Sequence, residues 1–293
     1  MPELAVSTWS LHRALGPTYR DLELHDIPRV AEYPYGQGSV SLLDLPDAVA
    51  AHGVALIEIC HFHFPRTDHV YLGMLRERLA TAGVGLQTLL IDAGDISAAD
   101  DEARERDLAC IRDWIDVASA LGARQARVIA GYSQPDDAAA VKRSSAGLAA
   151  LARYGEERSV RVITENWLAL SMRPETLLAI LAGAGAGVGL CADFGNYNGP
   201  GKYDDLRRIL PKATSIHAKA DFPEPGRMDA ADFRCCLDLS RAAGFSGPYV
   251  LIFDSAGDEW THLEQLIEVV RPYLSASDTA VDEIWRAPLR EMG

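Results

Sequence analysis

Eight short apolar segments alternate with longer helix-like segments, and this alternation constrains the fold more than any other feature of the sequence. Most of the short segments are apolar at nearly every position, which is typical of parallel strands covered on both faces. Helical periodicity is clearest at residues 101–122 and 229–244, with Gly122 and Gly244 as natural stops and Asp229 as a cap. The predicted strands are residues 4–9, 55–60, 86–91, 126–130, 160–165, 188–193, 214–219 and 249–254.

Eight strands alternating with helices predict an α/β fold, a (β/α)8 TIM barrel of about 250 residues, here a single domain over residues 1–274. An open doubly wound sheet is the alternative, because the pattern does not report closure. Two segments are longer than a barrel of eight strand–helix units requires. Residues 12–40 are expected to form a long first βα loop that acts as a lid. Residues 275–293 are expected to form a C-terminal extension, an extra helix packed on the barrel.

Charge and composition exclude several classes of function. The formal net charge of −14 opposes binding to nucleic acid or to an anionic membrane surface. No apolar run approaches the ~20 residues that a membrane-spanning helix needs. The five cysteines are scattered without a CxxC motif, and the N-terminal sequence does not resemble a signal peptide. We therefore expect free thiols and a cytoplasmic location.

Polar side chains stand at or just after the ends of several predicted strands, and in a barrel these ends form the active face. A carboxylate there is costly to bury unless it is paired or bound to a metal. Glu165, Asp193 and His217 close three successive strands, so we expect them to hold one divalent ion; this donor set suits Mn²⁺, Mg²⁺, Co²⁺ or Zn²⁺. The competing interpretation is that these groups pair with Arg and Lys or face solvent. The full set is Glu58, His61, His63, Glu165, Asn166, Asp193, Asn196, His217, Lys219 and Asp254.

Four stretches resemble the xylose isomerase-like TIM-barrel superfamily, in particular its sugar phosphate isomerase/epimerase branch. The likeness spans roughly residues 4–270. It implies one divalent metal bound by Glu165, Asp193 and His217, with the glutamate also moving a proton next to a carbonyl. The stretches are ITENW (163–167), CADFGN (191–196), IHAKADF (216–222) and residues 228–253.

The sequence departs from this family at two positions. Ile252 stands where relatives carry a metal-binding glutamate on the eighth strand; Asp254 lies two residues on, on the same face, and we predict that it replaces that ligand. Asn196 stands near where many relatives carry a histidine. This second departure and the acidic charge argue against the trinuclear-zinc endonucleases of the superfamily.

Further candidates come from the same strand ends and from the first βα segment. Lys219 is predicted to be catalytic by stabilising an enolate, or else to pair with Asp221. Glu58 is predicted to be a base, or else an internal salt-bridge partner. Residues predicted to bind substrate are His12, His61, Trp167 and Asn196.

These expectations combine into a metal-dependent isomerase or epimerase of a small carbohydrate, which acts by proton transfer next to a carbonyl. Two alternatives remain: a metal-dependent dehydratase or lyase of a cyclic polyol or keto acid, and a sugar-binding barrel without catalysis. The resemblance also implies that the chain can form a homo-oligomer.

Overall fold

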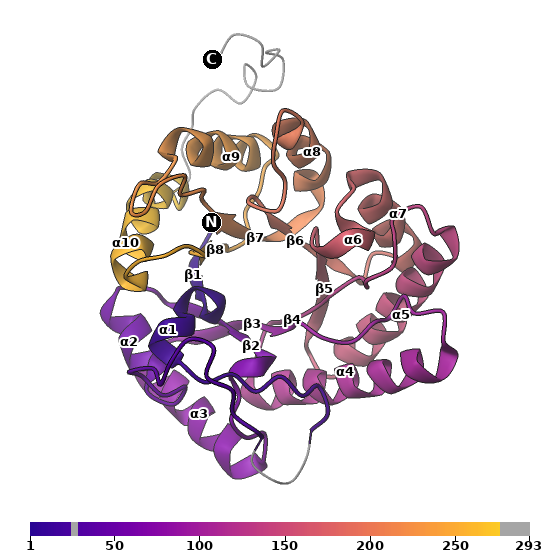
Figure 1. Ribbon diagram of the computed structural model, residues 1–293, viewed down its shortest axis with the longest axis horizontal. Helices are drawn as coiled ribbons and strands as arrows, with labels where there is room; N and C mark the ends of the chain where they lie inside the picture. The colour runs from indigo at the N-terminus through magenta and orange to yellow at the C-terminus, as the bar shows by residue number, and fades with distance from the viewer. Residues whose placement is uncertain (25–28, 276–293) are drawn as a thin grey trace.

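Eight parallel strands close into a barrel in chain order, and β1 pairs with both β2 and β8 (Figure 1). The predicted TIM barrel is confirmed, and the open sheet is wrong because the β1–β8 pairing leaves no edge. The computed structural model describes residues 1–24 and 29–275, so the predicted C-terminal helix lies, apart from Ser275, outside the described residues. The strands are β1 Leu4–Ser7, β2 Leu56–Cys60, β3 Gly85–Ile91, β4 Gln125–Val128, β5 Arg161–Glu165, β6 Gly189–Asp193, β7 Ala213–Lys219 and β8 Tyr249–Ile252.

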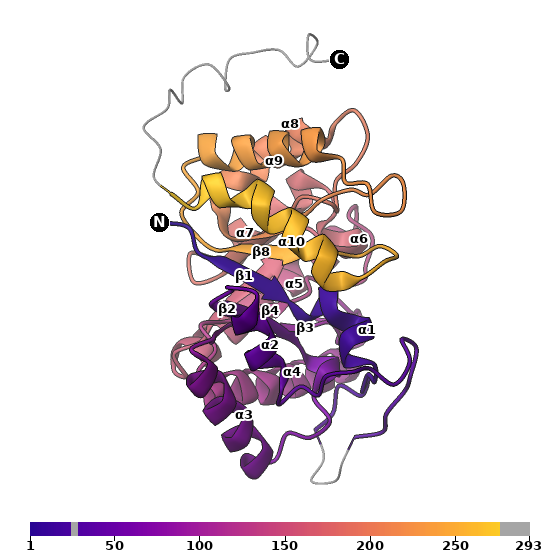
Figure 2. The same cartoon turned by 90° about the vertical axis from the view of Figure 1, so that its left-hand side faces the viewer.

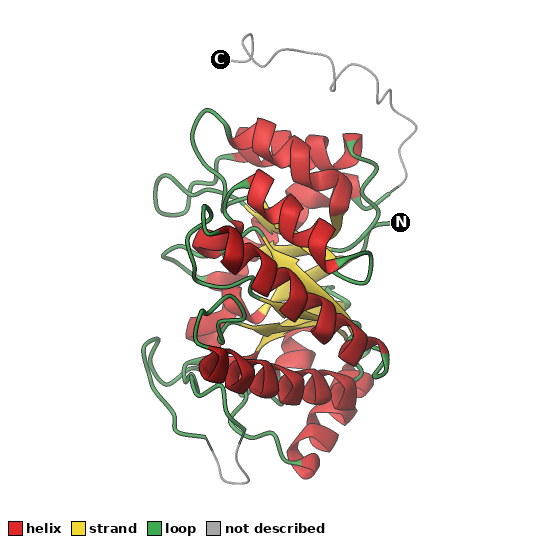
Figure 3. Ribbon diagram, turned by 90° about the vertical axis from the view of Figure 1, so that its right-hand side faces the viewer, coloured by secondary structure: helices red, strands yellow, loops and turns green. Residues whose placement is uncertain are grey.

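Helices surround the barrel and cover the outside of the sheet (Figure 3). Both predicted long helices are present. The first ends before Gly122, whose φ of 75° is left-handed, and the second begins after Asp229, whose carboxylate accepts the N–H of Asp232. No helix in the described ranges is long and apolar enough to cross a membrane. The helices are α1 His12–Leu15, α2 Leu45–Ala51, α3 His69–Ala82, α4 Asp101–Leu121, α5 Ala138–Glu156, α6 Leu168–Ser171, α7 Pro174–Ala184, α8 Lys202–Ile209, α9 Ala230–Ala242 and α10 Glu259–Val270.

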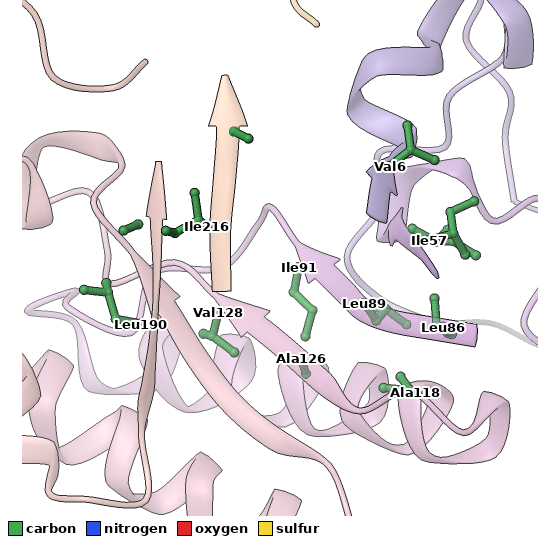
Figure 4. Packing of buried hydrophobic residues seen from close by; sticks show 14 of the residues in the cluster. Val6, Ile57, Leu86, Leu89, Ile91, Ala118, Ala126, Val128, Leu190 and Ile216 are labelled. Carbon is green, nitrogen blue, oxygen red and sulfur yellow. The ribbon is translucent and has the colours of Figure 1, made fainter. Parts of the chain in front are cut away.

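The main hydrophobic core lies between the strands and the helices (Figure 4). Side chains alternate along each strand, so Val6 and Ile57 face the helices while their neighbours face the barrel axis. The apolar cluster of Ala5, Leu56 and Val250 is separate from the main core. Buried polar side chains occupy much of the remaining interior, and they gather toward the carboxyl ends of the strands.

The described parts of the long segment between β1 and α2 lie at the end of the barrel toward which β1 points (Figure 2). It begins with the 3-10 turn η1 Thr8–Leu11 and helix α1 instead of a plain loop. Its described parts are fixed to the end of β2, because Tyr19 N–H donates to the carbonyl of Phe62 at 2.7 Å. The Arg29 guanidinium donates to the carbonyl of His61 at 2.8 Å. The segment is therefore bonded to the same face that carries the strand ends.

Gly155 allows helix α5 to approach β5 closely, and this contact generates a stability prediction. A Cβ at Gly155 would lie 2.5 Å from the carbonyl oxygen of Val160, which is backbone and cannot easily move. Gly155→Ala should therefore destabilise the fold by about 1–3 kcal/mol in urea unfolding. Gly73 is the matched control, because it lies in α3 with nothing within 4 Å of its Cβ position. Gly73→Ala should stabilise by about 0.5–1 kcal/mol; equal effects of the two changes would contradict the packing argument.

Candidate active site

Glu165, Asp193 and His217 meet at the mouth of the barrel, at the ends of β5, β6 and β7. Strand pairing aligns Asp193 with His217 and Glu165 with Cys191. The Nδ1 atom of His217 lies 3.3 Å from Glu165 Oε1 and 3.6 Å from Asp193 Oδ2. All three side chains are buried. The structure thus brings together the three residues that the sequence analysis grouped as metal ligands.

The loop after β6 and the end of β5 fix the carboxylate of Asp193. Its Oδ1 accepts the N–H groups of Gly195 at 2.7 Å and Asn196 at 3.0 Å. The side-chain amide of Asn166 binds the backbone of Asp193 in both directions, at 2.7 and 3.0 Å. Oδ2 is left to face His217.

Glu58 of β2 lies behind His217 and is fully buried. Its Oε2 lies 2.9 Å from Nε2 of His217, so the other ring nitrogen faces the carboxylates. Burial alone would lower the pKa of His217, but contacts with Cys191, Glu165 and Glu58 raise it well above the ordinary value. A carboxylate on the distal nitrogen is the usual way to orient a histidine ligand. Glu58 does not line the adjacent cavity, so its position favours the salt-bridge interpretation over that of a base.

Arg127 of β4 is a site residue that the sequence analysis missed. Its Nε lies 3.0 Å from Glu165 Oε2, its Nη2 pairs with Asp92, and its guanidinium lies over the ring of Trp167. The contact with Glu165 is an ion pair without hydrogen-bond alignment, because neither atom has a hydrogen-bond partner in the described chain. Burial would raise the pKa of Glu165, but His217 and Arg127 outweigh it and lower the pKa. A lone arginine inside an apolar run, as in ARVIA, is the signal that could have identified it.

Cys191 is a second missed residue. It precedes Asp193 by two positions and therefore points to the same side of β6. Its Sγ forms, with one donor atom each of Glu165 and His217, a group whose members lie within 4.8 Å of one another. Burial raises the pKa of this thiol to about 12, so it stays protonated unless a cation binds.

The donor set fits a divalent cation. Glu58, Glu165 and Asp193 surround one imidazole, and Arg127 is shared with a further carboxylate. Three donor atoms, one each from Glu165, Cys191 and His217, lie within 4.8 Å of one another, close enough to share one ion. Glu165, Asp193 and His217, with Cys191 beside them, are the residues that could hold the ion.

A cavity of about 90 Å³ opens beside this cluster. Lys219 and Asp254 lie on its wall and form an ion pair at 2.9 Å, so Lys219 pairs with Asp254 and not with Asp221. Ile252 lies on the same wall, as its place in the sequence suggested. The Asp254 side chain is 45% exposed. Its role as a ligand stays a prediction.

The residues predicted to bind substrate divide between two adjoining cavities. Asn196 lines the first and donates to Glu165 Oε1 at 3.1 Å. His12 and His61 line a second cavity of about 240 Å³, and Trp167 lines both. Trp167 is followed by Leu168, whose φ of 65° is unusual for a bulky residue. Such strain persists only where its surroundings enforce it, so neighbouring residues must hold the backbone just after Trp167 in this conformation.

The position of Cys191 predicts a spectroscopic signature. Co²⁺ bound to the chain should show an intense near-ultraviolet sulfur-to-cobalt charge-transfer band, because an ion deprotonates the thiol that it binds. Cys191→Ser should abolish the band. Cys60→Ser, a change at another fully buried thiol in a barrel strand, should leave it intact. Bound Co²⁺ without a band, or a band that survives in Cys191→Ser, would exclude Cys191 as a ligand.

Comparison with known proteins agrees with this architecture. No curated protein matches the chain. Among solved structures, an L-ribulose 3-epimerase is 18% identical with a TM-score of 0.69, covering 94% of this chain and 95% of that one. A magnesium complex of a xylose isomerase-like TIM barrel protein from Mycobacterium smegmatis is 16% identical, with a TM-score of 0.65 and coverages of 94% and 98%. A 3-keto-D-glucoside 4-epimerase from E. coli is 16% identical, with a TM-score of 0.61 and coverages of 79% and 94%.

At these identities the similarity to solved structures establishes the fold alone. The family model described as "Xylose isomerase-like TIM barrel" matches residues 46–272, which is most of the chain. The resemblance found in the sequence is therefore confirmed at this level: the chain belongs to the xylose isomerase-like TIM barrel family.

Proposed function

We propose that the chain is a divalent-metal-dependent sugar isomerase or epimerase that moves a proton next to a carbonyl. The observation that supports this most is the convergence of Glu165, Asp193 and His217 on one buried cluster beside a cavity. Two similar structures are named as epimerases, and another holds magnesium. The proposal extends the shared fold to a shared chemistry.

Each residue of the cluster has a distinct role in this proposal. Glu165, Asp193 and His217 hold the ion, which when bound would act as a Lewis acid and ease removal of the proton next to a carbonyl. Glu58 fixes the His217 ring through the 2.9 Å contact. Glu165 is kept ionised by His217 and Arg127 and lines the cavity, so it is the base that we assign. Asn196 holds Oε1 of that base in place.

Lys219 supplies positive charge where the substrate oxygen gains negative charge. Burial opposes its charged form, but Asp193 and Asp254 outweigh it and raise the pKa, so the side chain stays protonated near neutrality. A fixed ammonium beside the reacting atoms stabilises an enolate. Trp9 and Trp167 line the same cavity and supply apolar walls that limit the access of water to the enolate.

Solvent-deuterium exchange tests the proposal. The metal-loaded protein in D₂O should incorporate deuterium next to the carbonyl of at least one sugar in a ketose panel, as measured by NMR. Lys219→Met should slow this exchange by about 10²–10³-fold, as loss of an oxyanion-stabilising donor does. Lys212→Met, a change at an exposed lysine, should not alter it. A metal-loaded parent that exchanges no ketose proton would contradict the proposal.

A dehydratase is the second candidate, and the apolar wall at Ile252 favours it. Elimination of water needs one base and one acid, and the cavity offers Glu165 as an ionised base and Lys219 as a protonated acid. A dehydratase should produce a new ultraviolet absorbance from an unsaturated ketone. Deuterium exchange without that absorbance would favour the isomerase or epimerase, and absorbance that grows with exchange would favour the dehydratase.

A further inference from the structure

We propose that the second cavity binds a second sugar ring, so that the substrate is a glycoside or disaccharide and not a free monosaccharide. The inference rests on the proposed function, because it places the reacting ring in the first cavity beside Glu165. It concerns the cavity of about 240 Å³ bounded by Trp9, His12, Arg20 and Tyr35, among other residues.

The two cavities are direct neighbours on one face of the barrel. Trp9 and Trp167 line both, with ring centroids 5.9 Å apart. Arg127, which lines the first cavity, is paired with Asp92, which lines the second. The second cavity, about 240 Å³, is larger than the first, about 90 Å³. A ligand held at the cluster in the first cavity therefore has room to extend into the second.

Four of the residues that line the second cavity are aromatic. Trp9, Phe62 and Trp167 contribute rings from the ends of the strands, and Tyr35 contributes one from the segment between β1 and α2. Aromatic faces provide large, rigid apolar area, and a small number of polar groups then fixes the orientation of a ligand. The carbon–hydrogen face of a sugar ring matches such a wall.

Asp92 and His61 supply polar groups at this cavity that lack partners. Asp92 gives one oxygen to Arg127, while its Oδ2 is buried with no hydrogen-bond partner in the described ranges. His61 Nδ1 accepts the N–H of Asp92 at 3.1 Å, and burial lowers the pKa of this histidine to about 4. The Nε2 atom of His61 is likewise buried, with no hydrogen-bond partner among the residues that the structure describes. Both atoms belong to side chains that line the cavity, so hydroxyl groups of a ligand could supply the missing hydrogen-bond partners.

Residues of the first βα segment form part of the wall of this cavity. Tyr35 stacks on His12 with ring centroids 4.3 Å apart, and Arg20 adds a cationic donor. The pairing of Arg20 with Glu32 at 3.4 Å is exposed, so it is weak and leaves the guanidinium available. This gives the segment between β1 and α2 a specific role: it recognises the second ring.

Calorimetric titration of the full chain in the presence of Mn²⁺ tests the inference. The probes are D-fructose and its reducing glucosyl derivatives turanose, maltulose and palatinose, which share one ketose unit. At least one disaccharide should bind with a Kd about tenfold or more below that of fructose. Tyr35→Ala and Arg20→Ala change partly exposed side chains and should therefore leave the fold intact. Each should abolish the higher affinity for the disaccharide and leave the affinity for fructose unchanged.

Tyr33→Ala is the matched control, because Tyr33 is an exposed tyrosine of the same segment that does not line the cavity; it should keep the advantage. Fructose binding at least as tight as that of every disaccharide would overturn the second subsite and leave the proposed function standing. A disaccharide advantage that survives both cavity variants would also overturn it. Failure of every sugar to bind would overturn the subsite and the proposed function together.

Discussion

A chain of alternating charges across the mouth of the barrel organises the rest of the site. It runs from Glu58 to His217, then to Glu165, Arg127 and Asp92, and its members come from β2, β7, β5 and β4 and from the end of β3. All are buried, so each charge depends on its neighbours and not on water. Removal of His217 would leave Glu58, and removal of Arg127 would leave Asp92, as an unpaired buried charge, which costs about 3–5 kcal/mol. The barrel holds these charges in register because the strands that carry them are bonded to one another.

This chain of charges also divides the two oxygens of Glu165. Oε1 faces His217 and Asn196, while Oε2 faces Arg127. One oxygen of the carboxylate therefore faces the residues that could hold a cation, and the other oxygen is held by a fixed positive charge. The Glu165 carboxylate can therefore remain ionised although it is buried, because its charge is shared between two partners. Metal binding and proton abstraction both require this ionised form.

The sequence predicts the barrel well because its strands carry dense apolar runs that leave few alternative folds. Glu165, Asp193 and His217 could be grouped for the same reason: parallel strands all end at one face. Arg127 and Cys191 were missed because each lies inside an apolar run and resembles core. The pairing of Glu58 with His217 joins residues 159 positions apart, and only the register around the closed barrel brings them together. The partner of Lys219 was also missed for this reason. Lys219 pairs with Asp254 because β7 lies beside β8, and the sequence does not show which strands are neighbours.

The first cavity has a polar wall and a more apolar wall, and Ile252 belongs to the apolar one. The β5–β7 side carries Glu165, Asp193 and His217, whereas Leu90, Ile252 and Trp9 make much of the remaining wall apolar. Strand β8 ends at Ile252, so Asp254 lies beyond the sheet, where solvent and Lys219 share its charge. A sugar in this cavity can therefore place its oxygens toward β5–β7 and its carbon–hydrogen face toward the apolar wall. The second cavity is likewise lined by both kinds of side chain, with Trp9 and Trp167 as apolar groups and His61 and Asp92 as polar ones, so a ligand with one polar and one apolar face suits both cavities.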